Sequence, residues 1–531
     1  MSGDFNFNKI QREAEEDARI REKELKHVKE ISGNMEPIKG EKAELSATDR
    51  LWYDQDPSNK TEKLKEVIAY KYSGNGKYKL HESIILNGVQ CFITYDTEKE
   101  KVIIKEQIEE QNRIIRPPSL EECPFPAYEF ENEQELETYI KRANEIESIE
   151  ELYKSCRNFW TLYVDQEKEI LTMLAADSIL SYFQDLFPII HYSEAVGTND
   201  VGKSSIGYTF EYTGYRVVKG ASITGPNYFR IFGTVEPGQC VVIEDEGDSI
   251  SDNPDKIAIL KIAYEYNSKI PRTNMNVKNQ DMNWFYPYGY KMILAEKSIR
   301  EWKAKGLVDR TFTMKCRPGR VKYAIKDVVS NIINKSEQYR KLHDALLDFR
   351  KLMLTYRLIH YRDQLPKLAI NLENRDKELS YPLLELFYGT EVFDEIKESL
   401  EYFIQQRHER KANSIEAGLY PIIERLLKAK VNPNSSGLDN YRDIKFADIW
   451  ECITTKGEIE GYYDPKRPSE YESKEYGKLF RRSLSSLIAD AFGARINHTR
   501  TGSQLTLTSD NLRPSRIGIR KLTIIKSSRL T

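Results

Sequence analysis

The sequence predicts an α/β fold with a parallel sheet at its centre, helical segments before and after it, and a small β-rich unit near the N-terminus. Between residues 187 and 320, five short apolar runs alternate with helical patterns: PIIHYS, YRVVKG, QCVVIED, GYKMILAE and RTFTMKC. Strands that alternate with helices in this way usually pair in parallel. A glycine-rich octapeptide follows the first run, and acidic residues end the third. These observations place a ligand site at one edge of the predicted sheet.

The chain of 531 residues is too long for a single hydrophobic core. Changes in its pattern define six expected segments: a polar, partly disordered helical leader over 1–55, a small β-rich domain over 56–130, a helical lead-in over 131–186, the α/β core over 187–325, a helical domain over 326–430, and a winged-helix domain with a basic tail over 431–531.

The segments before the core differ in the period of their apolar residues. Residues 64–105 alternate apolar and polar positions between Gly/Asn turns, which indicates strands. The proline-rich stretch RPPSLEECPFPAYEF at 116–130 is typical of a linker leading out of this unit. From residue 132 to about 185 the apolar spacing changes to three and four residues, which predicts helices.

The segments after the core are helical up to the linker-like stretch KVNPNSSGLDN at 430–440. Beyond it, FADIWECI and KLFRRSLSSLIADAF have helical spacing, and two β-like runs surround Thr501-Gly502. Helices followed by such a hairpin predict the winged-helix domain.

Composition narrows the class of protein. No window approaches eighteen uninterrupted apolar residues, so we expect no membrane span. The N-terminus lacks the basic and apolar regions of a secretory signal. The six cysteines form no CxxC pair, which argues against a zinc site and against a disulfide framework. We therefore expect a soluble cytoplasmic protein.

The octapeptide matches the phosphate-binding pattern G-x-x-x-x-G-K-[ST] in full. It comprises Gly197, Thr198, Asn199, Asp200, Val201, Gly202, Lys203 and Ser204, and Ser205 follows. Glycines let backbone N–H groups turn inward towards phosphate oxygens. Lys203 is expected to reach the β- and γ-phosphates, and the hydroxyl of Ser204 to bind Mg²⁺. The helix that follows presents its positive end to the anion.

Acidic residues at the end of the run CVVI should complete this site. We assign Asp245 to the metal and Glu246 to the attacking water. Glu244 and Asp248 are the competing assignments, since the sequence leaves open a shift of one residue.

Two further features follow the acidic run. The run at 290–294 leads into Ala295-Glu296-Lys297-Ser298, where a polar side chain can sense the γ-phosphate or simply end a strand. Arg310 lies directly before the last predicted strand, where it can act as an arginine finger on a nucleotide held by a neighbouring subunit. A surface pair of Asp309 and Arg310 is the alternative.

Nucleic-acid contacts are suggested by local features rather than by the net charge, which is only -3. The C-terminal segment is basic, and Arg495, His498 and Arg500 belong to its predicted hairpin, where they can contact a phosphate backbone. The aromatic cluster at 284–288 offers stacking platforms for bases, with a patch that covers the sheet as the alternative.

The order GTNDVGKSS, VEPGQCVVIEDEGD, ILKIAYEYNSKIPRTN and YGYKMILAEKSIREWKAKGLVDRTFTMKCRPG resembles a group of phage, plasmid and archaeal primase- or helicase-associated ATPases. Their P-loop core is of the AAA+ or superfamily-3 helicase type. LENRDKELSYPLLELFYGTEVFDEIKESL is similar to their helical segment, with Arg375-Asp376 and Pro382-Leu383 in the matching places. No primase half is recognisable before residue 150, so priming is not expected.

This resemblance implies ATP and Mg²⁺ as ligands, a homo-oligomeric ring such as a hexamer, and single-stranded or forked DNA as partner. The leading hypothesis is an ATP-dependent DNA motor, either a helicase, a translocase or a replication-associated ATPase. A nucleotide-controlled switch or scaffold that does not translocate DNA is the alternative. A small-molecule kinase is disfavoured, because no acceptor-binding lid is evident in the sequence.

Overall fold

A computed structural model describes most of the chain from residue 65 onward. The described ranges are 65–74, 80–110, 112–273, 282–299, 305–330, 335–361, 365, 367–368, 374–412, 415–429, 441–474, 476–492, 494–499 and 502–508. The leader expected over 1–55, the basic tail after residue 508, and Arg500 lie outside these residues. No helix in the described part is both long enough and apolar enough to cross a bilayer.

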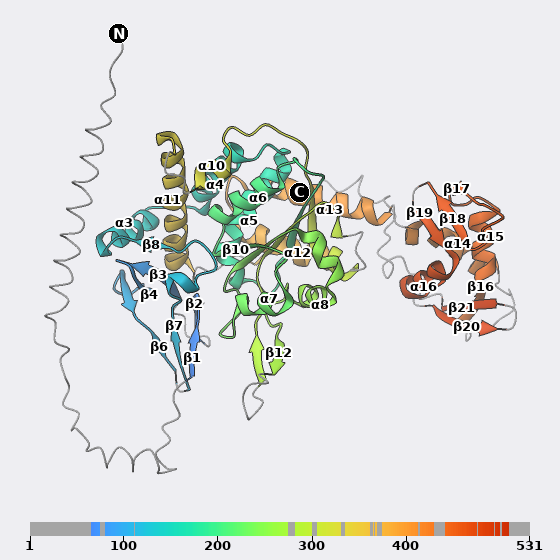
Figure 1. The fold of residues 1–531 in the computed structure, drawn as a ribbon, viewed down its shortest axis with the longest axis horizontal. Helices are drawn as coiled ribbons and strands as arrows, with labels where there is room; N and C mark the ends of the chain where they lie inside the picture. Colours follow the sequence, from blue (N-terminus) through green and yellow to red (C-terminus); the bar gives the residue numbers. More distant parts are fainter. Residues whose placement is uncertain are drawn as a thin grey trace, which may run out of the picture. The chain divides into compact units, whose positions relative to one another are not determined.

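A five-stranded sheet forms the centre of the fold (Figure 1). All four strand pairs in it are parallel, and the spatial order is β10-β11-β14-β9-β15. The strands are β9 (Tyr192–Val196), β10 (Val217–Ala221), β11 (Val241–Asp245), β14 (Lys291–Ala295) and β15 (Thr311–Lys315). The prediction of an α/β core with a parallel sheet is confirmed.

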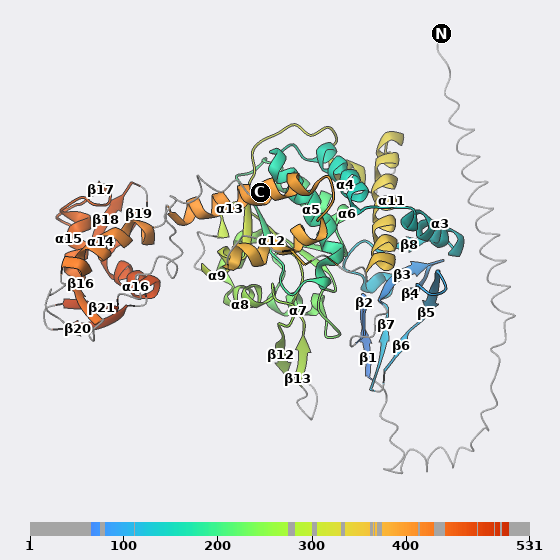
Figure 2. The same cartoon turned by 180° about the vertical axis from the view of Figure 1, so that it is seen from behind.

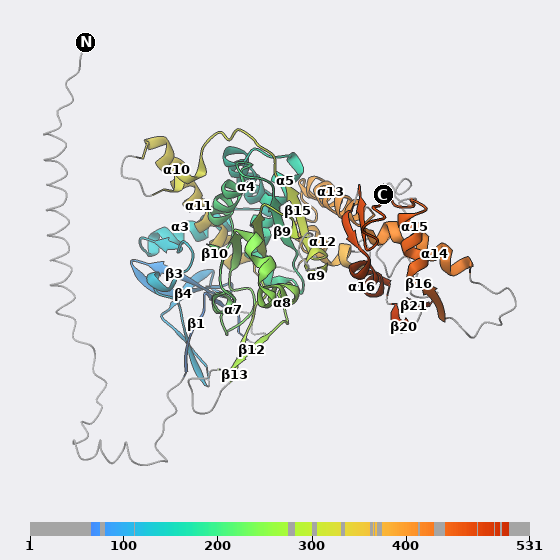
Figure 3. The same ribbon diagram turned by 45° about the vertical axis from the view of Figure 1, so that its right-hand side comes forward.

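Helices cover both faces of this sheet, and side chains of one strand alternate between the two faces. On β11, Val241 and Ile243 join one core cluster, whereas Val242 between them joins the other. The first face packs on α6 (Lys203–Thr213), whose Ile206 and Phe210 belong to the same cluster. The second face packs on α7 (Gly225–Phe232), α8 (Pro254–Ile262) and α9 (Lys305–Val308). Figure 3 shows α8 beside the strands.

The helical lead-in consists of α3 (Glu133–Asn144), α4 (Ile149–Tyr163) and α5 (Lys168–Phe183). Asn132 caps α3 and Ser148 caps α4, each accepting a hydrogen bond from a backbone N–H of the first turn. Nearly every residue of α5 is buried, because α4, α6 and α13 (Phe393–Ala412) all contact it. The helices after the core are α10 (Ile325–Val329), α11 (Glu337–His360) and α12 (Asn374–Leu386), followed by α13.

The β-rich unit is joined to the core through buried charges. Its strands are β1 (Lys65–Ile68), β2 (Lys71–Tyr72), β3 (His81–Leu86), β4 (Val89–Asp96), β5 (Lys101–Lys105), β6 (Ile108–Glu109), β7 (Arg113–Arg116) and β8 (Glu129–Phe130). Glu82 on β3 pairs with Arg216 at 2.7 Å and with Arg357 of α11 at 2.7 Å. Arg357 also pairs with Asp185 at 2.8 Å, and all four side chains are at most 1% exposed.

The proline-rich stretch at 116–130, which we expected to lead out of the β-rich unit, is packed against the core. Phe125 and Tyr128 are buried, and both rings lie against the guanidinium of Arg216. Aromatic side chains within this stretch therefore pack it against the core. The proline content from which we predicted a linker carries no signal for this packing.

The described residues between 415 and 508 form a module with its own hydrophobic core. Its elements are α14 (Ile415–Ala429), β16 (Tyr441–Lys445), α15 (Phe446–Thr454), β17 (Gly461–Tyr462), β18 (Glu470–Ser473), β19 (Gly477–Phe480), α16 (Arg481–Phe492), β20 (Arg495–Thr499) and β21 (Gly502–Thr508). β21 pairs antiparallel with both β16 and β20, as seen at the module's edge in Figure 2. The outer strands of this sheet are β16, which follows α14 in the chain, and β20, which follows α16. That the module is a winged helix stays a prediction.

Candidate nucleotide site

The phosphate loop, residues 197–204, connects β9 to α6 at the carboxyl edge of the sheet. Gly202 has φ of 86° and Asp200 has φ of 65°, so the backbone passes twice through the left-handed region. The loop is anchored to the next strand, because the N–H of Gly197 donates to the carbonyl of Ala295 at 3.3 Å. These turns give the curled backbone that a phosphate nest needs.

Lys203 and the two serines lie where the loop becomes a helix. The Nζ of Lys203 donates to the carbonyls of Gly197 and Thr198, the latter at 2.8 Å, so the side chain folds back across the loop. Ser204 and Ser205 occupy the first turn of α6 and are half-buried. The side chain of Lys203 thus lies across the loop at the N-terminus of α6, where the first N–H groups of a helix have no partner within the helix.

Glu244 and Asp245, the last two residues of β11, project to opposite faces of the sheet. Glu244 projects to the α8 face, where its carboxylate pairs with Lys256 at 2.9 Å and accepts from the N–H of Ile223 at 3.0 Å. Asp245 is one residue further along the strand and so projects to the α6 face. There its Oδ2 lies 3.5 Å from the Nζ of Lys219. Only Asp245 of these two is on the phosphate-loop side of the sheet.

The other two acids differ in what they bind. Asp248 accepts from the N–H groups of Glu296 at 2.7 Å and Lys297 at 3.0 Å, so it fixes the segment after β14. Glu246 is exposed and has φ of 67°, at the point where the chain leaves β11. A carboxylate already committed to two backbone amides is a poorer candidate for water chemistry than an exposed one.

The segment after β14 lies between the phosphate loop and the acidic strand, since β14 separates β9 from β11. Ser298 donates from Oγ to the carboxylate of Glu194 on β9 at 3.1 Å, and the N–H of Ile299 donates to the same group. Glu194 is fully buried. This segment is therefore held by Glu194 of β9 and by Asp248, which follows β11; its role as a γ-phosphate sensor stays a prediction.

Arg310 lies at the opposite edge of the sheet from the phosphate loop. Its carbonyl accepts from the N–H of Tyr192 at 2.9 Å, at the amino end of β9. Its guanidinium lies 4.3 Å from the ring centre of Tyr264 and donates to the carbonyl of Gly306. The structure does not bring Arg310 together with the loop of its own chain.

The proposed DNA contacts in the last hairpin are only partly described. Arg495 is exposed on β20, and His498 pairs with Ser503 of β21 through the backbone. The side chain of His498 is not among the described ones, and Arg500 lies outside the described residues. At the start of α16, Arg481 and Arg482 are also exposed, although sequence reasoning did not single them out.

The aromatic cluster at 284–288 divides between two environments. The side chain of Tyr288 is fully buried, and its hydroxyl donates to the carbonyls of Gln184 and Phe187. Trp284 is 47% exposed on the hairpin of β12 (Ile270–Thr273) and β13 (Met282–Phe285). The hairpin extends from the core beside α7 (Figure 1). Sequence reasoning missed it, because no turn signal such as Asn-Gly joins the two strands.

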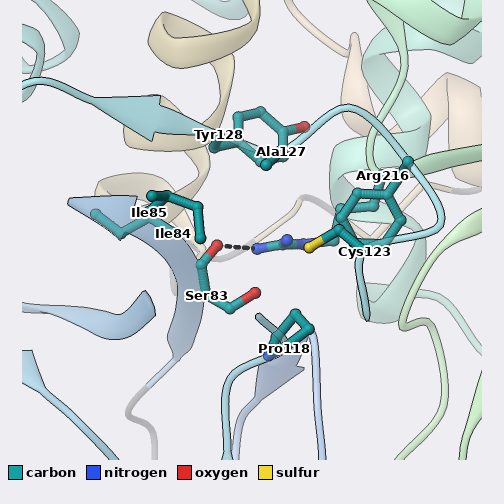
Figure 4. Close-up of a pocket in the computed structure, with 9 residues that line it drawn as sticks. Ser83, Ile84, Ile85, Pro118, Cys123, Ala127, Tyr128 and Arg216 are labelled. Carbon is teal, nitrogen blue, oxygen red and sulfur yellow. Dashed lines mark hydrogen bonds between the residues drawn. The ribbon is translucent and has the colours of Figure 1, made fainter. Parts of the chain in front are cut away.

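A small pocket lies away from the phosphate loop, at the junction of β3 with the core (Figure 4). Its lining includes Cys123, Phe125 and Tyr128, and Arg216 donates there to the carbonyl of Ser83 at 2.8 Å. None of the residues of the phosphate loop lines it. The pocket belongs to the packing of the β-rich unit rather than to the candidate site.

Comparison with known proteins gives limited information. No protein-family model matches the sequence, and no curated protein sequence is significantly similar to it. Among solved structures, the apo NrS-1 C-terminal region is similar with 11% identity and a TM-score of 0.28, over 81% of this chain and 96% of that chain. The JCV helicase is similar with 13% identity and a TM-score of 0.23, over 51% and 66%. At these TM-scores neither likeness establishes an activity.

Proposed function

We propose that this chain is a Mg²⁺-dependent ATPase that works as a ring-forming DNA motor. The observation that carries the proposal is the phosphate loop at the carboxyl edge of a parallel sheet, with Asp245 projecting to the same face as α6. Lys203 binds carbonyls of its own loop and pairs with no carboxylate of the described residues, and a triphosphate would supply an anion for this ammonium group.

The residues at this edge fit a Mg²⁺–triphosphate. Mg²⁺ is usually held by one or two protein oxygens together with phosphate oxygens, and here the hydroxyl of Ser204 and the carboxylate of Asp245 would hold it. When bound, Mg²⁺ neutralises charge that develops on the phosphates. The N–H groups of the loop orient the triphosphate, and Glu246 is free to orient water. The segment after β14 lies between them and senses the γ-phosphate.

The place of Arg310 supports assembly into an oligomer. An arginine at the amino edge of the sheet serves the nucleotide of an adjacent copy if copies pack head to tail. Such heterologous contacts close into a ring when the rotation between copies allows it. Its present partners, the Gly306 carbonyl and the Tyr264 ring, hold the guanidinium at that edge.

Two basic surfaces support DNA as the partner. At the β12–β13 hairpin, Lys269 directly before β12 and Arg272 on it are exposed, and Trp284 on β13 is exposed opposite Pro271; these residues give cations for a backbone and a ring for stacking. In the C-terminal module, α16 buries Leu484, Ile488 and Phe492 and exposes the arginines at its start. We propose that this helix and the β20–β21 hairpin form the winged-helix contact with DNA.

ATP hydrolysis measured with and without DNA tests the proposal. We expect single-stranded or forked DNA to increase the rate, and Lys203→Ala to abolish hydrolysis in both conditions. Hydrolysis that no nucleic acid stimulates at low salt would instead favour the nucleotide-controlled switch.

A further inference from the structure

Two residues between α4 and α5, Asp165 and Gln166, bind two loops at the phosphate edge. The Nε2 of Gln166 donates to the carbonyl of Val201 at 3.0 Å and to the carbonyl of Arg317 at 2.8 Å. Its Oε1 accepts from the N–H of Arg317 at 3.0 Å. Asp165 accepts from the N–H of Arg320 at 2.8 Å. One carboxamide, which is only 6% exposed, thus joins the phosphate loop to residues 316–320.

The bond to Val201 bears directly on the shape of the phosphate loop. A loop whose N–H groups turn inward to an anion turns carbonyls outward, and a buried carbonyl without a partner is costly. Val201 is buried directly before the left-handed Gly202, so Gln166 supplies the partner at the tightest part of the loop. The bond therefore stabilises the backbone conformation that a triphosphate requires.

Through its bonds to Arg317, Gln166 also links the phosphate loop to the segment after β15. Cys316 donates from its N–H to the carbonyl of Val196 at 2.8 Å, directly before the loop begins. A Cβ added to Gly197 would come within 3.1 Å of the carbonyl oxygen of Cys316. The start of the phosphate loop and the segment after β15 are therefore in direct backbone contact. Gln166 links the same two segments at a second place, through Val201 and Arg317.

We infer that Gln166 is a positioning residue of the nucleotide site, which holds the phosphate loop in its binding conformation and couples its occupancy to residues 316–320. The inference rests on the proposed function, because it assumes that the loop binds a triphosphate. In this role Gln166 acts through the backbone of Val201, to which its Nε2 donates.

Two variants of Gln166 remove different sets of its hydrogen bonds. Gln166→Met keeps the length of the side chain and removes every hydrogen bond. Gln166→Glu keeps an acceptor for the N–H of Arg317 and removes the donor to Val201. Gln184→Met is the matched control, because Gln184 is also a buried glutamine that bridges backbone groups, accepting from Tyr290 at 2.6 Å and donating to Cys240 at 3.2 Å. Those groups lie at the opposite edge of the sheet.

The readouts are the Kd for the slowly hydrolysed analogue ATPγS and hydrogen exchange of residues 316–320 with and without it. We expect both Gln166 variants to raise the Kd at least about tenfold, which corresponds to about 1.4 kcal/mol. The analogue should protect residues 316–320 in the wild type but not in Gln166→Met. The control should lose thermal stability and keep the Kd.

Two results separate the inference from the proposed function. If the wild type binds ATPγS and the Gln166 variants bind it equally well with the same protection, the positioning role is wrong and the nucleotide site stands. If the control weakens binding as much as the Gln166 variants do, the effect is one of general stability, and the inference is also overturned. A wild type that binds no nucleotide contradicts the proposed function itself.

Discussion

Arg310→Ala should abolish ATP hydrolysis while leaving ATP binding intact, because the arginine cannot reach the phosphate loop of its own chain. Its carbonyl binds the N–H of Tyr192, and Gly197 is five residue steps further along β9 and its end. At about 3.3 Å per residue the two edges are roughly 16 Å apart. An extended arginine side chain spans less than half of this distance. Any γ-phosphate that Arg310 contacts must therefore belong to another copy.

The size of the effect distinguishes a shared site from a structural role. Loss of an arginine finger lowers the hydrolysis rate by about 10³–10⁵. Arg375→Ala is the control, since its guanidinium lies 5.0 Å from the same Tyr264 ring and pairs with Glu378 on its own helix. We expect this control to retain most of the activity.

The assay mixes Arg310→Ala with Lys203→Ala chains in equal amounts. A working site then needs an intact loop from one variant and an intact arginine from the other. Random assembly gives this combination at about one site in four, so a mixture of two inactive proteins should recover about a quarter of the wild-type rate. No recovery after subunit exchange, while wild-type and variant chains demonstrably co-assemble, would refute the reasoning.

The remaining predictions concern the neighbouring charges and the hairpin. Lys256→Met should lower the free energy of unfolding by about 3–5 kcal/mol at neutral pH, because it leaves Glu244 buried without its cation. Burial raises the pKa of Glu244, so the folded state takes up a proton more readily than the unfolded state. The stability lost in Lys256→Met should therefore shrink as the pH falls from about 7 towards about 5, which thermal melts can measure. An equal loss of stability at both pH values would contradict this. Lys219→Met should lower the Mg²⁺ concentration for half-maximal hydrolysis, because the ammonium group competes with the cation for the metal aspartate; a higher requirement would mean that the lysine assists binding. Trp284→Ala should weaken binding of single-stranded DNA about tenfold in a fluorescence titration, since a stacked base contributes about 1–3 kcal/mol, whereas the exposed Tyr462→Ala control should not.

The sequence predicted the parallel sheet and the succession of strand, loop and helix at 192–213 well, because both have local signals. Gly197 to Ser204 is a contiguous motif, and the structure begins α6 at Lys203, as its pattern indicates. The order of the strands has no such signal. That β14 lies between β9 and β11 depends on packing between segments almost a hundred residues apart.

The choice between Glu244 and Asp245 had a signal that sequence reasoning did not use. Val241 and Ile243 share one face of the strand, so the alternation already places Asp245 with them and Glu244 opposite. Gln166 had no signal of any kind. It lies 35 residues before Val201 and 151 residues before Arg317, and a glutamine between two helices looks like an ordinary connector.

Calorimetric titration of the purified protein with ATP and Mg²⁺ tests the central claim most directly. The arrangement of the phosphate loop, Ser204 and Asp245 predicts Mg²⁺-dependent binding of one ATP per chain, and Lys203→Ala and Asp245→Asn should each weaken it while the protein stays folded. Absence of heat in the wild type, confirmed by failure to retain labelled ATP on a filter, would contradict the claim.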